Sequence, residues 1–171
     1  EHADVLLAPL VENGGGDLVA DFCRPYPIPI ICRLLGIDDE DSEQFGRWAD
    51  VIFSGLDADA EAVLGRMAEI TSAQKELDQY ATALVADRKG CPHSDLVSDL
   101  VQASYEEDRL SVDELVAMIE AILLAGTDTT RNQLGSLLAV LATQPAQYPR
   151  LREDRSLVPA AIEESLRYIG A

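Results

Sequence analysis

Aromatic residues and long uncharged segments are both scarce in this chain of 171 residues. Only 5% of the residues are aromatic although 47% are hydrophobic, so we expect a core of small aliphatic side chains. No run of about twenty uncharged apolar residues is present, and we therefore expect no membrane-spanning helix. The first residues lack a basic stretch followed by an apolar block, so they do not resemble a signal peptide. A cytoplasmic protein is the default expectation.

Basic residues are also few. The chain has 13 lysines and arginines against 31 aspartates and glutamates, a net charge of −18. Such a surface repels nucleic-acid phosphates and anionic lipids, so neither nucleic acid nor membrane is an expected partner. Residues 36–62 hold nine acids and one base, whereas four arginines cluster near the C-terminus: Arg150, Arg152, Arg155 and Arg167. We interpret both regions as solvated faces rather than docking patches.

Cysteine is limited to Cys23, Cys32 and Cys91. This odd number without Cys-x-x-Cys spacing argues against a disulfide framework and against a zinc site. Cys91 lies near His93, but one such pair cannot complete a tetrahedral site, and we interpret it as part of a loop. We expect no metal ligand among these residues.

Helical periodicity dominates the chain, and no alternating strand pattern is present, so the fold class is mainly α. Prolines 25, 27 and 29 predict an extended entry into a helix that begins near Ile28 and ends at Gly36. The other helices are predicted over residues 4–13, 38–56, 57–90, 94–109, 111–144, 145–156 and 158–171.

The helix predicted over 111–144 is long and central. Ser111 and Glu114 form a capping-box pattern at its start, and Pro145 stops it after Gln144. It is apolar on nearly every side, which is typical of a helix inside a large protein. We therefore expect residues 1–171 to be a single helical portion of a larger domain, truncated at both ends.

The segment "ILLAGTDTTRNQL" breaks this apolar pattern. The spacing predicts that Gly126 and Thr129 continue the face formed by Leu115, Ile119 and Ile122. Glycine costs about 1 kcal/mol relative to alanine in a helix, and it permits close approach by something flat or bulky. A threonine can bond back to the carbonyl four residues earlier and bend the helix.

Asp128 is the charged residue of this segment. A buried carboxylate must be paired, and Arg131 three residues later is a suitable partner. An acid beside the hydroxyl of Thr129 forms a plausible proton-delivery pair. The alternative is that Asp128, Thr129, Thr130 and Arg131 only satisfy one another at a helix bend.

Two motifs together resemble the cytochrome P450 family, in its soluble bacterial branch. These are "AGTDTT" (125–130) in the long helix and "EESLR" (163–167) in a later one. The resemblance implies the helical core of that fold around one long central helix, with the sheet-rich lobe missing. It also implies that Glu164 and Arg167 form a structural pair.

The same resemblance implies site residues. Ala125 and Gly126 would lie against a haem, Thr129 would contact the haem and the bound oxygen, and Asp128 would relay protons. The substrate pocket would be lined by Leu123, Leu124 and residues 51–56. None of the three cysteines has the flanking glycines and phenylalanine of the family's ligand loop, so the chain alone is expected to be inactive.

The implied activity of the complete protein is insertion of one atom of O₂ into a small organic substrate. Electrons would come from NAD(P)H through a ferredoxin reductase and a ferredoxin. Two alternatives stay open: a haem-free relative that activates a partner enzyme, such as a glycosyltransferase of an antibiotic pathway, and an acidic helical module unrelated to haem. The intact Asp128–Thr129 pair favours the enzyme.

Overall fold

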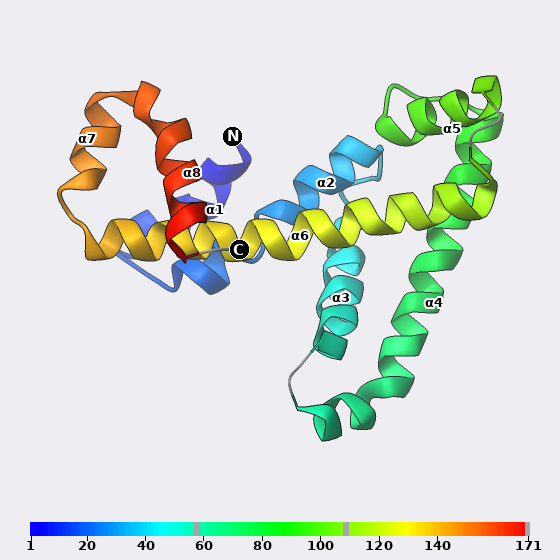
Figure 1. Cartoon of the computed structure of the whole chain (residues 1–171), viewed down its shortest axis with the longest axis horizontal. Helices are drawn as coiled ribbons and strands as arrows, with labels where there is room; N and C mark the ends of the chain where they lie inside the picture. Colours follow the sequence, from blue (N-terminus) through cyan, green and yellow to red (C-terminus); the bar gives the residue numbers. More distant parts are fainter. Residues whose placement is uncertain (57–58, 108–109, 170–171) are drawn as a thin grey trace. The chain divides into compact units, whose positions relative to one another are not determined.

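The computed structural model describes residues 1–56, 59–107 and 110–169, and these ranges contain helices and no strand (Figure 1). The α-helices are α1 (His2–Glu12), α2 (Pro27–Leu35), α3 (Ser42–Phe53), α4 (Ala60–Gly90), α5 (Leu96–Glu107), α6 (Val112–Thr143), α7 (Gln147–Glu153) and α8 (Val158–Ile169). Three short turns are η1 (Val19–Cys23), η2 (Ser54–Leu56) and η3 (Arg155–Leu157). The predicted mainly α fold class is confirmed. No helix in the described ranges has the length and apolar character needed to cross a membrane.

Local side-chain hydrogen bonds fix where the long helices begin and end. At the start of α6, Glu114 N–H donates to Ser111 Oγ over 3.3 Å, and Ser111 N–H donates to Glu114 Oε2 over 2.8 Å. This confirms the predicted capping box, which satisfies two backbone donors reciprocally. Asp59 caps α4 by accepting from the backbone N–H of Glu61 over 3.0 Å. Gly36 ends α2 with φ +73°, a conformation that favours glycine.

The segment before α2 differs from the prediction. The helix predicted to begin near Ile28 begins at Pro27, but the chain ahead of the prolines is helical rather than extended. Val19–Cys23 forms a π-helical turn, in which Arg24 N–H bonds to the Val19 carbonyl over 2.9 Å. Asp17 starts the turn, since its Oδ1 accepts from the N–H of Val19 over 2.9 Å. This side-chain cap stabilises helical geometry ahead of the prolines.

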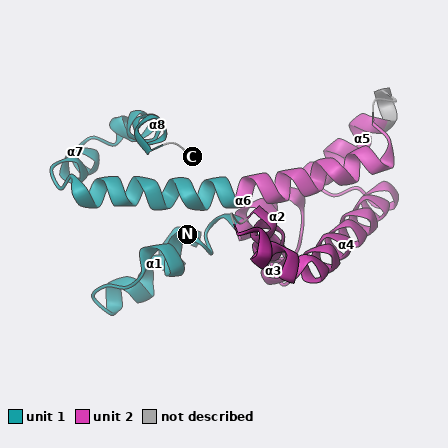
Figure 2. Cartoon of the chain, turned by 60° about the horizontal axis from the view of Figure 1, so that its bottom comes forward, with its two compact units in different colours: residues 1–27, 128–171 teal, residues 28–127 magenta. Residues whose placement is uncertain are grey.

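The chain divides into two compact units (Figure 2). One consists of residues 28–127, with α2 to α5, η2 and the first half of α6. The other consists of residues 1–27 and 128–171, with α1, η1, the second half of α6, α7, η3 and α8. That all of them belong to one larger domain stays a prediction.

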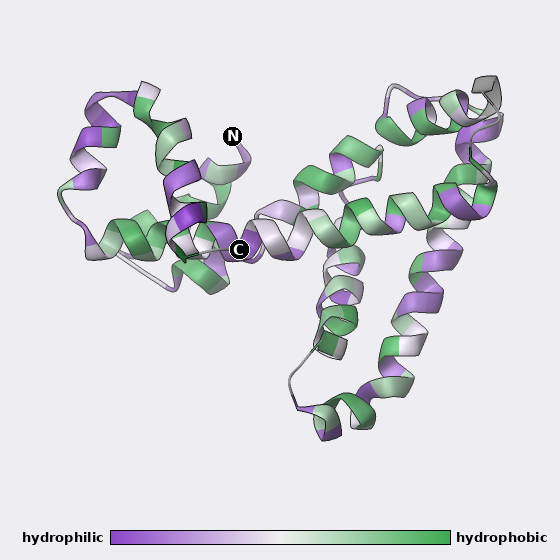
Figure 3. Cartoon of the chain, viewed as in Figure 1, coloured by the Kyte–Doolittle hydropathy of each residue, from purple (hydrophilic) through white to green (hydrophobic). Residues whose placement is uncertain are grey.

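The unit of residues 28–127 has an aliphatic core with an aromatic edge. Its largest fully buried apolar members come from α2, α4, α5 and α6: Cys32, Leu35, Leu77, Val85, Val97, Leu115 and Ile119. Phe45 packs edge-on against Trp48 and Tyr80, with ring centroids 5.0 and 4.8 Å away. Figure 3 shows the apolar residues along the α6 ribbon in green. Small aliphatic residues therefore supply most of the core, as the composition indicates.

A buried ion pair joins three segments of the same unit. Arg88, near the end of α4, is 6% exposed, and its Nε donates to Asp95 Oδ2 over 2.8 Å. Its Nη2 donates to the Gly36 carbonyl over 2.6 Å, and its Nη1 donates to Asp87. Burial favours a higher pKa for Asp95, but hydrogen bonds from Ser98 and the Arg88 pairing outweigh it and lower the pKa. The guanidinium thus connects the end of α2, α4 and the start of α5.

Candidate functional site

The motif residues Ala125, Gly126, Asp128 and Thr129 lie in the middle of α6, which is continuous from Val112 to Thr143. Ala125 and Thr129 are exposed and lie one helical turn apart, whereas Gly126 and Asp128 are half-buried. Because residues four apart share a face, Ala125 and Thr129 form a short surface of small side chains.

The buried face of α6 agrees with the predicted face only in the first half of the helix. The buried residues of α6 are two neighbours near its start and then every third or fourth residue: Leu115, Val116, Ile119, Leu123 and Thr127. Of the predicted face, Leu115 and Ile119 are buried and Gly126 is half-buried, but Thr129 is exposed, because the core beyond Ile119 lies on the side of Leu123 and Thr127. Thr127 is fully buried, and its hydroxyl donates to the Leu123 carbonyl over 2.6 Å. Sequence reasoning missed Thr127, although its i+4 spacing from Leu123 indicates the same face.

Asp128 is held by its own helix. Its Oδ2 accepts a hydrogen bond of 3.1 Å from Asn132 Nδ2, and its Oδ1 lies 3.7 Å from Arg131 Nε. The predicted pairing with Arg131 is therefore present. The Asp128 side chain is 35% exposed, so the carboxylate is anchored on one side and open to solvent on the other. Such a group can exchange protons with a neighbouring hydroxyl.

Gly126 permits a close approach within the unit of residues 28–127. A Cβ atom at this position would lie 2.6 Å from Ile31 Cδ1 and 3.2 Å from Ile31 Cγ1. The missing side chain therefore lets α2 pack against α6. Contact of Gly126 with a haem stays a prediction.

Substituting Gly126 by valine is expected to destabilise the protein by about 1–3 kcal/mol, the usual cost of overpacking a well-packed site. Gly126→Ala is expected to cost less, since alanine gains about 1 kcal/mol of helix propensity and the Ile31 terminus can move. Urea unfolding of both variants measures this. If the valine variant is as stable as the wild type, the Ile31 contact does not limit the packing.

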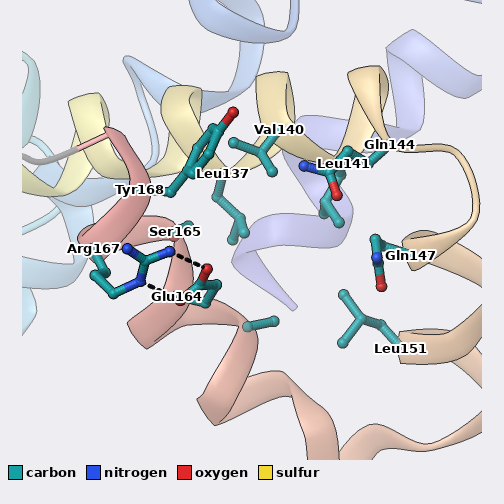
Figure 4. A pocket seen from close by; sticks show the side chains of 11 residues that line it. Leu137, Val140, Leu141, Gln144, Gln147, Leu151, Glu164, Ser165, Arg167 and Tyr168 are labelled. Atoms are coloured by element: carbon teal, nitrogen blue, oxygen red, sulfur yellow. Dashed lines mark hydrogen bonds and ion pairs between the residues drawn. The ribbon is translucent and has the colours of Figure 1, made fainter.

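Glu164 and Arg167 form the predicted pair on α8. Two hydrogen bonds of 2.7 Å, from Arg167 Nε and Nη2, reach the two oxygens of the Glu164 carboxylate (Figure 4). The hydrogen bond from Arg167 lowers the pKa of Glu164. Both side chains are exposed on the wall of a pocket of about 340 Å³, whose aliphatic part comes from α6, α7 and α8: Leu137, Val140, Leu141, Leu151 and Ala161. In the part of the chain that the structure describes, the hydrogen bonds of these two side chains join them to each other.

Most of the predicted pocket-lining residues lie together, because Leu124 and residues 51–53 pack against the core cluster that contains Leu123. Leu123 is 4% exposed and belongs to the core, while Leu124 is half-buried beside it. Residues 51–56 form the end of α3 and the turn η2, where Leu56 is 79% exposed. Their role in binding a substrate stays a prediction.

The two buried cysteines, Cys23 and Cys32, do not resemble activated thiolates. Burial, with the charges of Asp39 and Asp41, raises the pKa of Cys32 to about 12. Burial also raises the pKa of Cys23. Metal ligation requires the thiolate, and a raised pKa opposes its formation. Cys91 is exposed in the segment between α4 and α5.

Comparison with known proteins defines the class. The sequence profile described as Cytochrome P450 matches residues 55–170, so this chain belongs to the cytochrome P450 family. It is 37% identical to Cytochrome P450 107B1 of Saccharopolyspora erythraea, over 96% of the chain and 38% of that protein. It is also 37% identical to the Vitamin D(3) 25-hydroxylase of Pseudonocardia autotrophica, over 98% of the chain and 40% of that protein.

The solved structures agree. Ligand-free cytochrome P450 TbtJ1 is similar with a TM-score of 0.85 and 36% identity, covering 97% of this chain and 43% of that one. The chain therefore spans about 40% of the length of the relatives it matches. The predicted resemblance to bacterial cytochromes P450 is confirmed.

The family implies haem, and the residues of α6 fit one face of it. A flat ring needs a surface without bulky side chains, which the exposed Ala125 and Thr129 provide. The described residues contain no group of three or more His, Cys, Asp and Glu side chains placed to hold a metal ion. The fit therefore concerns contact with the ring rather than ligation of iron.

Proposed function

We propose that this chain is the helical part of a haem-thiolate monooxygenase that inserts one oxygen atom of O₂ into a small organic substrate. Electrons would reach it from NAD(P)H through a reductase and a ferredoxin. The observation that carries the proposal is the segment Ala125–Thr129 on α6, with small residues exposed on one face and an anchored carboxylate beside them. Family membership supports this choice of chemistry.

The haem, when bound, would supply oxygen activation. Ala125 and Thr129 would contact the ring, and Gly126 would support this segment by letting α2 pack closely against α6. The hydroxyl of Thr129 would hold a proton in hydrogen-bonding range of the reacting oxygen. Asp128, fixed by Asn132 and near Arg131, would exchange protons with solvent and pass them on.

Glu164 and Arg167 would act structurally. Two hydrogen bonds join the charged groups of Glu164 and Arg167 on α8, so each neutralises the other. Neither residue belongs to the motif of α6. We assign them to holding the haem-binding core, as the family motif implies.

The iron ligand is not assigned to any cysteine of this chain. Cys23 and Cys32 are buried thiols with raised pKa values, and Cys91 is on an exposed segment between helices. We infer that the thiolate comes from a residue outside residues 1–171.

A carbon monoxide difference spectrum tests the proposal. The complete protein is expected to give the Soret band of a thiolate-ligated haem, whereas the 171-residue chain supplied with haem is expected not to give it. A thiolate-type band from the chain alone would show that one of its own cysteines is the ligand. A complete protein that takes up no haem would instead support a haem-free partner protein.

A further inference from the structure

Glu120 is a carboxyl group in the apolar part of α6 that the proposed reaction does not use. Its Oε1 is buried and has no hydrogen-bonding partner among residues 1–56, 59–107 and 110–169. Its Oε2 accepts one hydrogen bond, of 3.3 Å, from Nε2 of Gln74 on α4. The α6 neighbours one turn away carry no charge: Val116, Ala117, Leu123 and Leu124. Glu120 therefore connects α6 to α4 through one long hydrogen bond.

The surroundings favour the neutral form of this carboxyl. Burial raises the pKa of Glu120, and the negative charge of Asp78 on α4 raises it further. Asp78 is itself exposed on α4, and none of the ion pairs between described side chains includes Glu120. A buried, unpartnered carboxylate oxygen is costly, whereas a protonated carboxyl removes most of that cost.

We propose that Glu120 is a pH-sensitive contact between α4 and α6, which holds the two helices together when protonated and loosens them when ionised. The folded protein then binds a proton at Glu120 more tightly than the unfolded chain does. The contribution to stability is complete below the pKa of an unperturbed glutamate and is lost as the pH rises through the raised pKa. Both helices belong to the unit of residues 28–127, so the contact acts within one compact body.

Glu120→Gln in the full chain tests this, because glutamine keeps the shape and cannot ionise. The difference in Tm between the variant and the wild type is expected to grow by roughly 2–4 °C, in favour of the variant, between pH 5 and pH 8. Glu163→Gln, at an exposed position of α8, is the matched control and should track the wild type at every pH. A Tm difference that is constant with pH for Glu120→Gln overturns the proposal.

Hydrogen exchange locates the effect. After correction for intrinsic exchange rates, the amides of α4 around Gln74 are expected to open more at pH 8 than at pH 5 in the wild type, and equally at both values in Glu120→Gln. Asp78→Asn provides a second variant, because removing its charge should lower the pKa of Glu120 and shift the wild-type transition to lower pH. If exchange around Gln74 is independent of pH, or Asp78→Asn leaves the transition unmoved, the contact is not pH-sensitive as proposed.

Discussion

Thr129→Ala in the complete protein is expected to divert electrons from product to hydrogen peroxide. Positioned proton transfer contributes about 10²–10⁴-fold to enzymatic rates, so we expect the product formed per NAD(P)H to fall by roughly tenfold or more. The physical reason is the loss of the hydroxyl that directs a proton from Asp128. Product and peroxide, measured against NAD(P)H consumed, give the result.

Thr130→Ala is the matched control for this experiment. Thr130 is the next residue of α6 and is also exposed, but it is not the motif residue assigned to the oxygen. It is expected to keep wild-type coupling. Equal coupling in all three proteins would leave Thr129 as a helix residue without a role in proton delivery.

Arg88→Leu is expected to cost about 3–5 kcal/mol of unfolding free energy, the usual effect of removing one member of a buried ion pair. The Asp95 side chain is 4% exposed and would lose the guanidinium 2.8 Å away. The Gly36 carbonyl would lose its 2.6 Å donor as well. Urea unfolding measures the change.

Arg66→Leu serves as the control on the same helix. Arg66 also forms an ion pair, with Glu69 over 3.0 Å, but both side chains are largely exposed, and surface pairs contribute little. A loss for Arg88→Leu no larger than that for Arg66→Leu would contradict the assigned role of the buried pair.

Asp95 adds a pH dependence of the opposite sign to that of Glu120. Its pKa is lowered in the folded protein, mainly by hydrogen bonds that outweigh burial. Its contribution is therefore complete above the pKa of an unperturbed aspartate and is lost as the pH falls through the lowered pKa.

Local chemistry made the helix ends predictable from the sequence. The Ser111–Glu114 capping box, the glycine after α2 and the proline after α6 each act within a few residues, and the structure confirms them. The motif pair was recognisable for the same reason, since each motif lies in one short segment. The π-helical turn at Val19–Cys23 was missed because it starts at the Asp17 side chain, and the prolines that follow the turn give no signal for it.

Contacts between distant segments were not predictable. Arg88 near the end of α4 has the sequence context of a residue that interacts with the helix dipole, and nothing local indicates that Gly36 and Asp95 surround it. From the sequence, Gly126 was expected to make room for a haem ring, and the structure shows that Ile31 of α2 lies in the space beside it. The exposure of Thr129 was not predicted because α6 is apolar nearly all round, so periodicity alone does not select which side is buried beyond Ile119.

The central claim is that the exposed face of Ala125 and Thr129 contacts haem. Its most direct test compares the haem spectra of two variants of the complete protein, Ala125→Trp and Ala139→Trp. Both alanines are exposed on α6. Circular dichroism of each variant serves as the check that it is folded. The claim predicts that Ala125→Trp loses haem or shifts its Soret band while Ala139→Trp retains the wild-type spectrum. Equal haem content and identical spectra in the two variants would contradict it.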